Sequence, residues 1–137
     1  MIKMKKLAAV AAAAIMAVST MAVEASAEGF DKANGTSPYG NFTGSTTITG
    51  TSGRTVTVEN RMPSLTVVPE IGLNVVIRME ETGEIVYANS PFNYNNWYVG
   101  LQASSASTNR NVSVNSIYLV GNGAGSYWKA SNSNVTG

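Results

Sequence analysis

The sequence predicts an all-β fold, an antiparallel β-sandwich of about eight short strands, with a small β-barrel as the alternative. Apolar and polar residues alternate with a period of two over several stretches, and turn residues separate these stretches. No window after residue 27 has a helical period. Because strict alternation gives each strand one buried and one solvated face, the pattern favours antiparallel sheets.

The chain of 137 residues begins with the pattern of a secretory signal peptide. Residues 1–6 are basic, residues 7–18 form an unbroken apolar run, and Ala25-Ser26-Ala27 offers the small residues that signal peptidase needs. We therefore expect cleavage before Glu28 and an extracellular product, with a leader of bacterial style. The alternative is an uncleaved membrane anchor, but a spanning helix needs about 20 apolar residues.

Three segments are expected along the chain: a signal peptide at 1–27, an extended N-terminal arm at 28–44 and a β-sandwich domain at 45–137. The arm is composed of Gly, Asn, Ser and Thr with isolated aromatic residues and has no period. The chain that remains after cleavage is long enough for one small domain.

The first three strands are predicted at 45–50, 54–60 and 64–69. Val56 and Val58 share one face of the second strand. Thr51-Ser52-Gly53 suits a short hairpin turn with Gly in a left-handed conformation. Pro63 and Pro69 mark strand ends, since proline cannot donate to a ladder.

Three further strands are predicted at 72–80, 84–89 and 95–104. The first two are joined by a turn at Glu81-Thr82-Gly83. Pro91 separates the last two. The apolar face of these strands is expected to contain Leu73, Val75, Ile77 and Met79, followed by Trp97, Val99, Leu101 and Ala103.

The last two strands are predicted at 110–120 and 125–131, with the Gly-rich segment 121–125 as the turn between them. Val112 and Val114 have one parity, whereas Ile117 and Leu119 have the other. A one-residue slip near Asn115-Ser116 would place all four on one face, so we expect a β-bulge there.

Composition excludes several classes of function. The chain has no His and no Cys, which removes a Ser-His-Asp triad, a Cys nucleophile and imidazole or thiolate metal sites. Residues 28–137 carry six basic against seven acidic residues, scattered along the chain, so nucleic acid is not an expected partner. We expect no enzymatic activity, no cofactor and no metal ion.

Two weaker patterns have simpler explanations. Glu80, Glu81 and Glu84 surround a predicted turn, where solvent keeps carboxylates ionised; a weak calcium site is the alternative. Ser126-Tyr127-Trp128-Lys129 matches S-x-x-K, but that motif needs helical spacing and this segment is predicted to be a strand.

Aromatic residues interleaved with Asn suggest a ligand site, because rings stack on sugar C–H faces and amides bond hydroxyl groups. The same residues also suit a protein interface or simple core packing. Trp97 is expected in the core, and Tyr98 is expected on the opposite, exposed face. The candidate ligand-binding residues are Phe92, Tyr94, Asn95, Asn96, Tyr98 and Trp128.

These observations predict a secreted, non-catalytic β-sandwich that binds a glycan or the cell envelope. Tyr98→Ala is expected to weaken binding without loss of the fold. A membrane-active or antimicrobial protein is the alternative, with membrane contact only in that case. Self-assembly into an extracellular structure is a further alternative, because uncharged strand edges invite strand addition. The sequence leaves the oligomeric state open.

Overall fold

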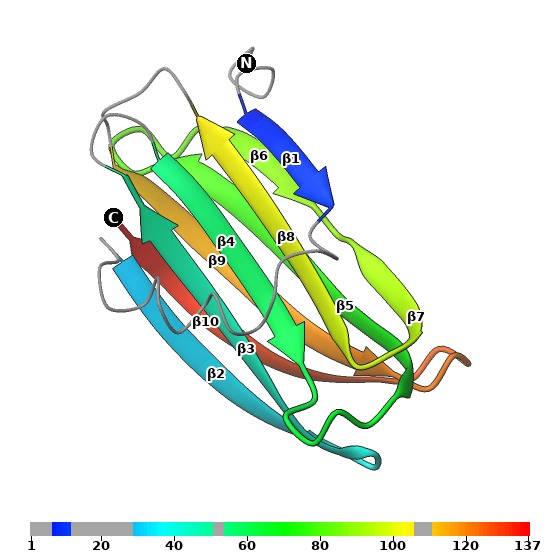
Figure 1. The fold of residues 1–137 in the computed structure, drawn as a ribbon. Coiled ribbons are helices and arrows are strands. Elements are labelled where there is room, and N and C mark those ends of the chain that lie inside the picture. Colours follow the sequence, from blue (N-terminus) through cyan, green and yellow to red (C-terminus); the bar gives the residue numbers. More distant parts are fainter. Residues whose placement is uncertain (1–6, 12–28, 51–53, 106–110) are drawn as a thin grey trace.

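A computed structural model of the protein describes residues 7–11, 29–50, 54–105 and 111–137. These residues form ten strands and no helix, in two antiparallel sheets that pack face to face (Figure 1). The predicted all-β antiparallel sandwich is thus confirmed, and the sheets do not close into a barrel. Within the same residues no helix could cross a membrane.

Sheet I contains five strands in the order β1-β8-β4-β3-β2. Their bounds are β1 (Leu7–Ala11), β8 (Tyr98–Ser105), β4 (Arg54–Arg61), β3 (Gly40–Thr49) and β2 (Gly29–Ser37).

Sheet II has the order β10-β9-β5-β6, and β7 pairs with the other half of the same edge of β5. Its bounds are β5 (Val68–Met79), β6 (Ile85–Asn89), β7 (Phe92–Asn96), β9 (Val112–Gly121) and β10 (Tyr127–Thr136).

The core lies between the two sheets and follows the predicted alternation. In β5, alternate side chains from Ile71 to Ile77 are buried. Val56 and Val58 of β4 and Val99 and Leu101 of β8 face them from sheet I. Burial of these aliphatic side chains supplies most of the driving force for folding.

The segment predicted as an N-terminal arm is part of the sandwich. Residues 29–37 form β2, which pairs along its whole length with β3 in continuous register. A Cβ on Gly35 would lie 2.2 Å from the ring of buried Phe42, so the missing side chain makes room for that ring. The alternation in β2 is hidden because its inward positions, such as Ala33 and Gly35, are small. The predicted boundary at residue 44 therefore does not exist in the fold.

Two strand predictions need correction between β4 and β8. Most of the predicted strand at 64–69 is a loop: Leu65 has a positive φ of 63°, and β5 begins only at Val68. The predicted strand at 95–104 is split at Trp97 into β7 and β8. Asn95 has a φ of 51°, and Oδ1 of Asn96 accepts hydrogen bonds from the backbone N–H groups of Trp97 and Tyr98 at 2.8 and 3.3 Å.

The predicted bulge near residues 115–116 is wrong. β9 pairs with β5 in uninterrupted register, and its inward face continues from Val114 through Ser116 to Tyr118. The register shift lies instead in β10, between Asn132 and Val135. Ser116 keeps the inward face because its hydroxyl group has a buried partner, and Ile117 then faces outward.

A polar cluster inside the sandwich joins both sheets. The Thr46 hydroxyl group lies 2.7 Å from the Ser116 hydroxyl group and 2.6 Å from that of Tyr118. Tyr118 also donates to Oδ1 of Asn132, whose amide donates to Asp31 at 2.9 Å. Because buried polar groups are costly without partners, these bonds select one register for each strand.

Two predicted turns can be compared with the structure. Gly83 has a φ of 76° and its N–H donates to the carbonyl group of Met79 at 2.8 Å, as expected for a tight hairpin turn. Gly123 and Gly125 also have positive φ values, 78° and 97°. The predicted turn at 51–53 and Arg110 lie outside the described residues.

Of the predicted signal peptide, only Leu7–Ala11 is described. This segment is β1, antiparallel to β8 at the edge of sheet I, where Leu7 pairs with Ser105 and Ala11 with Leu101. The cleavage before Glu28 stays a prediction.

Candidate functional site

The outer face of sheet II carries two neighbouring rows of residues that each cross four strands. Strand register places Tyr127, Gly121, Glu70 and Tyr94 in the first row. The second row, two residues further along the strands, contains Lys129, Leu119, Gly72 and Phe92. Each row ends in an aromatic ring on β7, and the first row also begins with one on β10.

The two glycines in these rows let aromatic rings lie against the sheet. A Cβ on Gly72 would be 2.3 Å from the Phe92 ring, and a Cβ on Gly121 would be 2.7 Å from the Tyr127 ring. The ring centroids of Phe92 and Tyr127 are 6.1 Å apart with planes at 65°. We call Phe92, Tyr94 and Tyr127 the aromatic ledge, because the two packed rings form a corner rather than a flat surface.

The ledge is open to solvent and has a carboxylate beside it. Tyr94 and Tyr127 expose 63% and 40% of their surfaces, whereas Glu70 exposes only 9%. Oε1 of Glu70 accepts a hydrogen bond from the N–H of Gly123 at 3.3 Å. Desolvation, the charge of the nearby Glu70 carboxylate and a side-chain hydrogen bond to it raise the pKa of Tyr127.

The structure brings together only part of the predicted site. Phe92 and Tyr94 lie on the ledge, and Asn95 follows Tyr94 in β7 with its side chain exposed. Asn96 is used by the fold itself, since its side chain accepts the two backbone bonds that shape the bend before β8.

Tyr98 is on the outward face, as predicted, but it is not exposed. Only 6% of its surface is accessible, and its hydroxyl group donates to Oε2 of Glu59 at 2.7 Å on the outer face of sheet I. Burial raises the pKa of Glu59, while the Tyr98 hydrogen bond and the charge of Arg61 lower it. Burial and the bond to Glu59 also raise the pKa of Tyr98. Tyr98→Ala is therefore expected to change the stability of the fold, and a loss of binding by this variant would not by itself identify a ligand contact.

Trp128 faces away from the ledge, although Tyr127 beside it belongs to the ledge. Its ring meets Tyr39 edge-on, with centroids 6.3 Å apart, and packs against the core. Trp97 also packs against the core, as predicted. Tyr127 was missing from the predicted site. The parity of β10, in which Tyr127 and Lys129 alternate with Trp128 and Ala130, could have indicated which ring faces outward.

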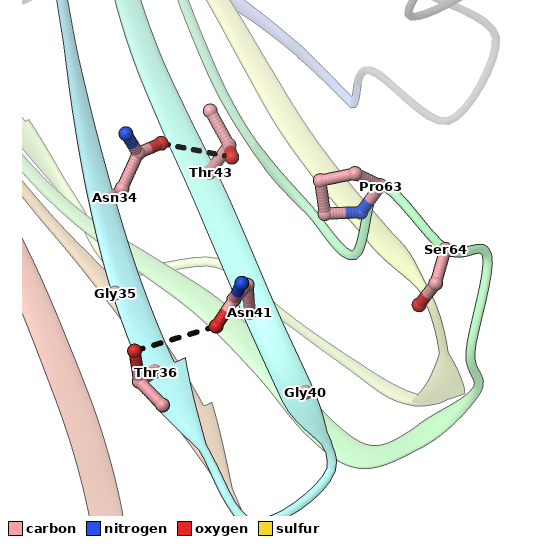
Figure 2. A pocket seen from close by; sticks show the side chains of 8 residues that line it. All are labelled: Asn34, Gly35, Thr36, Gly40, Asn41, Thr43, Pro63 and Ser64. Atoms are coloured by element: carbon pink, nitrogen blue, oxygen red, sulfur yellow. Dashed lines mark hydrogen bonds between the residues drawn. The ribbon is translucent and has the colours of Figure 1, made fainter.

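A second, polar hollow lies on the outer face of sheet I, at the closed end of the β2–β3 hairpin (Figure 2). Its volume is about 560 Å³, and it is lined by Asn34, Gly35, Thr36, Gly40, Asn41, Thr43, Pro63 and Ser64. Thr43 donates to Oδ1 of Asn34 at 3.0 Å, and Thr36 donates to Oδ1 of Asn41 at 3.4 Å. These bonds orient both amides, so their NH₂ groups can serve as donors to a hydroxyl-rich ligand. The sequence pattern did not reveal this hollow.

Metal binding has no support in the described residues, where no group of three or more His, Cys, Asp or Glu side chains could hold an ion. The comparisons with known proteins add nothing to the geometry: no family model, no curated relative and no solved structure matches the chain.

Proposed function

We propose that the chain is a secreted, non-catalytic recognition module that binds a glycan of the cell envelope or a similar polysaccharide through the aromatic ledge. The observation that carries the proposal is the registered pair of rows, in which Gly72 and Gly121 seat two rings beside exposed Tyr94. The signal-peptide pattern and the absence of His and Cys support secretion and the lack of catalysis.

The chemistry of the ledge suits a saccharide. The apolar C–H face of a sugar ring stacks on an aromatic ring, and tyrosine offers a large apolar surface with a polar hydroxyl group at its end. Two phenol groups, together with Glu70 inside the first row and Lys129 at the end of the second, can bond the hydroxyl groups that stacking leaves at the rim. A corner of two rings suits a single extended chain.

The test is a pull-down of the exported protein with insoluble polysaccharides and isolated cell envelopes, using Tyr94→Ala and Tyr127→Ala. We expect each substitution to weaken binding on the order of tenfold. Ile85→Ala is the matched control, because it shortens an exposed apolar side chain of sheet II outside the ledge. The proposal is wrong if Asn34→Ala or Asn41→Ala abolishes binding while the ledge variants bind normally, since the ligand would then occupy the hollow.

One observation favours the membrane-active alternative. The loop between β4 and β5 exposes Leu65 and Val67, at 60% and 58% of their surfaces. If this loop enters lipid, the protein should release dye from liposomes, and Leu65→Ser with Val67→Ser should abolish the release. Polysaccharide binding without release would reject this alternative.

A further inference from the structure

The edge of β8 takes an antiparallel strand in the full chain. Five consecutive residues of β1 pair with residues 101–105 of β8, so the backbone groups along this part of the edge lie next to a partner strand (Figure 1). That partner belongs to the leader, which the sequence predicts to be removed before Glu28. Loss of the leader would leave an unpaired edge.

The part of the chain after residue 28 contains a core of its own. The hydrophobic core of the described side chains runs from Phe42 to Val135. It draws residues from both sheets. We therefore expect the chain that begins at Glu28 to keep the sandwich.

Within β8 itself, three features that protect exposed edges are missing. Its sequence, Tyr98–Ser105, contains no charged residue and no proline, and its pairing with β4 shows no bulge. The other edge of sheet I approaches sheet II at one end, where a Cβ on Gly29 of β2 would be 2.2 Å from the carbonyl oxygen of Thr136 in β10. In sheet II, β6 is only five residues long.

We propose that, after loss of the leader, the β8 edge pairs with β8 of a second copy of the chain and forms a two-fold symmetric dimer. Antiparallel self-pairing is what a closed two-fold interface requires. A register with Leu101 opposite Ala103 of the second copy keeps both side chains on the inward face, and it places Gln102 opposite Gln102 at the axis. The dimer goes beyond the proposed binding function and rests on the predicted cleavage.

The first test is the molecular mass of the full chain and of the chain that begins at Glu28, measured by sedimentation across concentrations from about 1 µM to 1 mM, the range expected for a small interface. We expect the full chain to remain a monomer and the shorter chain to reach twice the monomer mass. A shorter chain that is folded by circular dichroism and monomeric at the highest concentration would overturn the proposal.

The second test locates the interface. The chain has no cysteine, so a disulfide-linked dimer can form only through an introduced cysteine. In the chain that begins at Glu28, Gln102→Cys should cross-link two copies under mild oxidation. Thr57→Cys is the matched control, because Thr57 pairs directly with Gln102 and lies one strand away from the edge. Equal cross-linking at both positions would contradict pairing through β8.

A third variant keeps the test valid even if the shorter chain does not fold. In the full chain, Ala9→Pro removes a backbone donor from the middle of β1, opposite Ala103. We expect this variant to dimerise where the unaltered full chain does not; a folded, monomeric variant would overturn the proposal. Tyr94→Ala should leave dimer formation unchanged, so failure of the binding function and failure of the dimer are separately visible.

Discussion

Tyr94 and Tyr98 are four residues apart in the sequence and have opposite surroundings. Tyr94 is 63% exposed on the ledge, whereas Tyr98 is 6% exposed and bonded to Glu59. Alternation correctly separated Tyr98 from the core residues Val99 and Leu101. It could not show that the outward side chain has a buried carboxylate as its partner, because that partner comes from β4.

Glu59 should make stability depend on pH. Burial raises its pKa above the ordinary value of 4.5, so the folded state holds the proton more tightly than the unfolded state does. The stabilisation is therefore present below about pH 4.5 and is lost as the pH rises through the raised pKa. Glutamine does not titrate, so Glu59→Gln should not lose stability in this way. In urea unfolding we expect the free energy of unfolding of the variant to rise relative to that of wild type from about pH 4 to pH 7.

If the free energies of unfolding of Glu59→Gln and wild type differ by the same amount at pH 4 and at pH 7, this explanation is wrong. Tyr98→Phe is the companion variant. It removes the hydrogen bond that lowers the pKa of Glu59, so the loss of stability with rising pH should become larger.

At the scale of the strand, β5 decides where the ledge forms. Its inward side chains belong to the core, and its outward positions include Glu70 and Gly72. β7 pairs with β5 at these positions, which brings Phe92 onto Gly72 and Tyr94 next to Glu70. The ledge thus depends on register, since a shift of one residue would turn the rings to the other face.

Gly72→Ala should disrupt the ledge with a limited loss of stability. The added methyl group would lie 2.3 Å from the Phe92 ring, which must leave its position. We expect a loss of about 1–3 kcal/mol in the free energy of unfolding and on the order of tenfold in polysaccharide binding. Asn74→Ala, at an exposed position of the same strand, should change neither. If Gly72→Ala binds polysaccharide normally, Phe92 is not part of the ligand site.

At the scale of the whole molecule, polar bonds as well as apolar packing hold the sheets together. Nδ2 of Asn60 in β4 donates to the carbonyl groups of Gly72 and Leu119 in sheet II, at 3.1 and 3.0 Å. The Thr46–Tyr118 contact joins the sheets a second time. The ledge and the hollow lie on opposite outer faces of this sandwich, so substitutions at one need not disturb the other.

Asn60→Ala should weaken the docking of the two sheets. It removes both bonds and leaves a small cavity at a position with no exposed surface. We expect the free energy of unfolding to fall by about 2–3 kcal/mol, measured by urea denaturation. Asn41→Ala, an exposed asparagine of sheet I, is the control and should cost much less. A loss equal to that of the control would show that the inter-sheet bonds contribute nothing.

The sequence by itself determined the fold class, most strand positions and the tight turn at Gly83. These features depend on local alternation and turn chemistry, which a single chain displays directly. The same reasoning missed β2, because its inward positions are too small to show a period, and it placed a bulge in β9 because it could not foresee a buried partner for Ser116.

Only the tertiary structure decided which aromatic residues share a surface. The sequence indicated Phe92 and Tyr94, but the ledge also needs Tyr127 from β10, while Tyr98 and Trp128 lie elsewhere. Strand order and register bring residues 94 and 127 into one row across β5 and β9. These pairings are between residues distant in the chain, and they follow from packing of the whole core rather than from any local pattern.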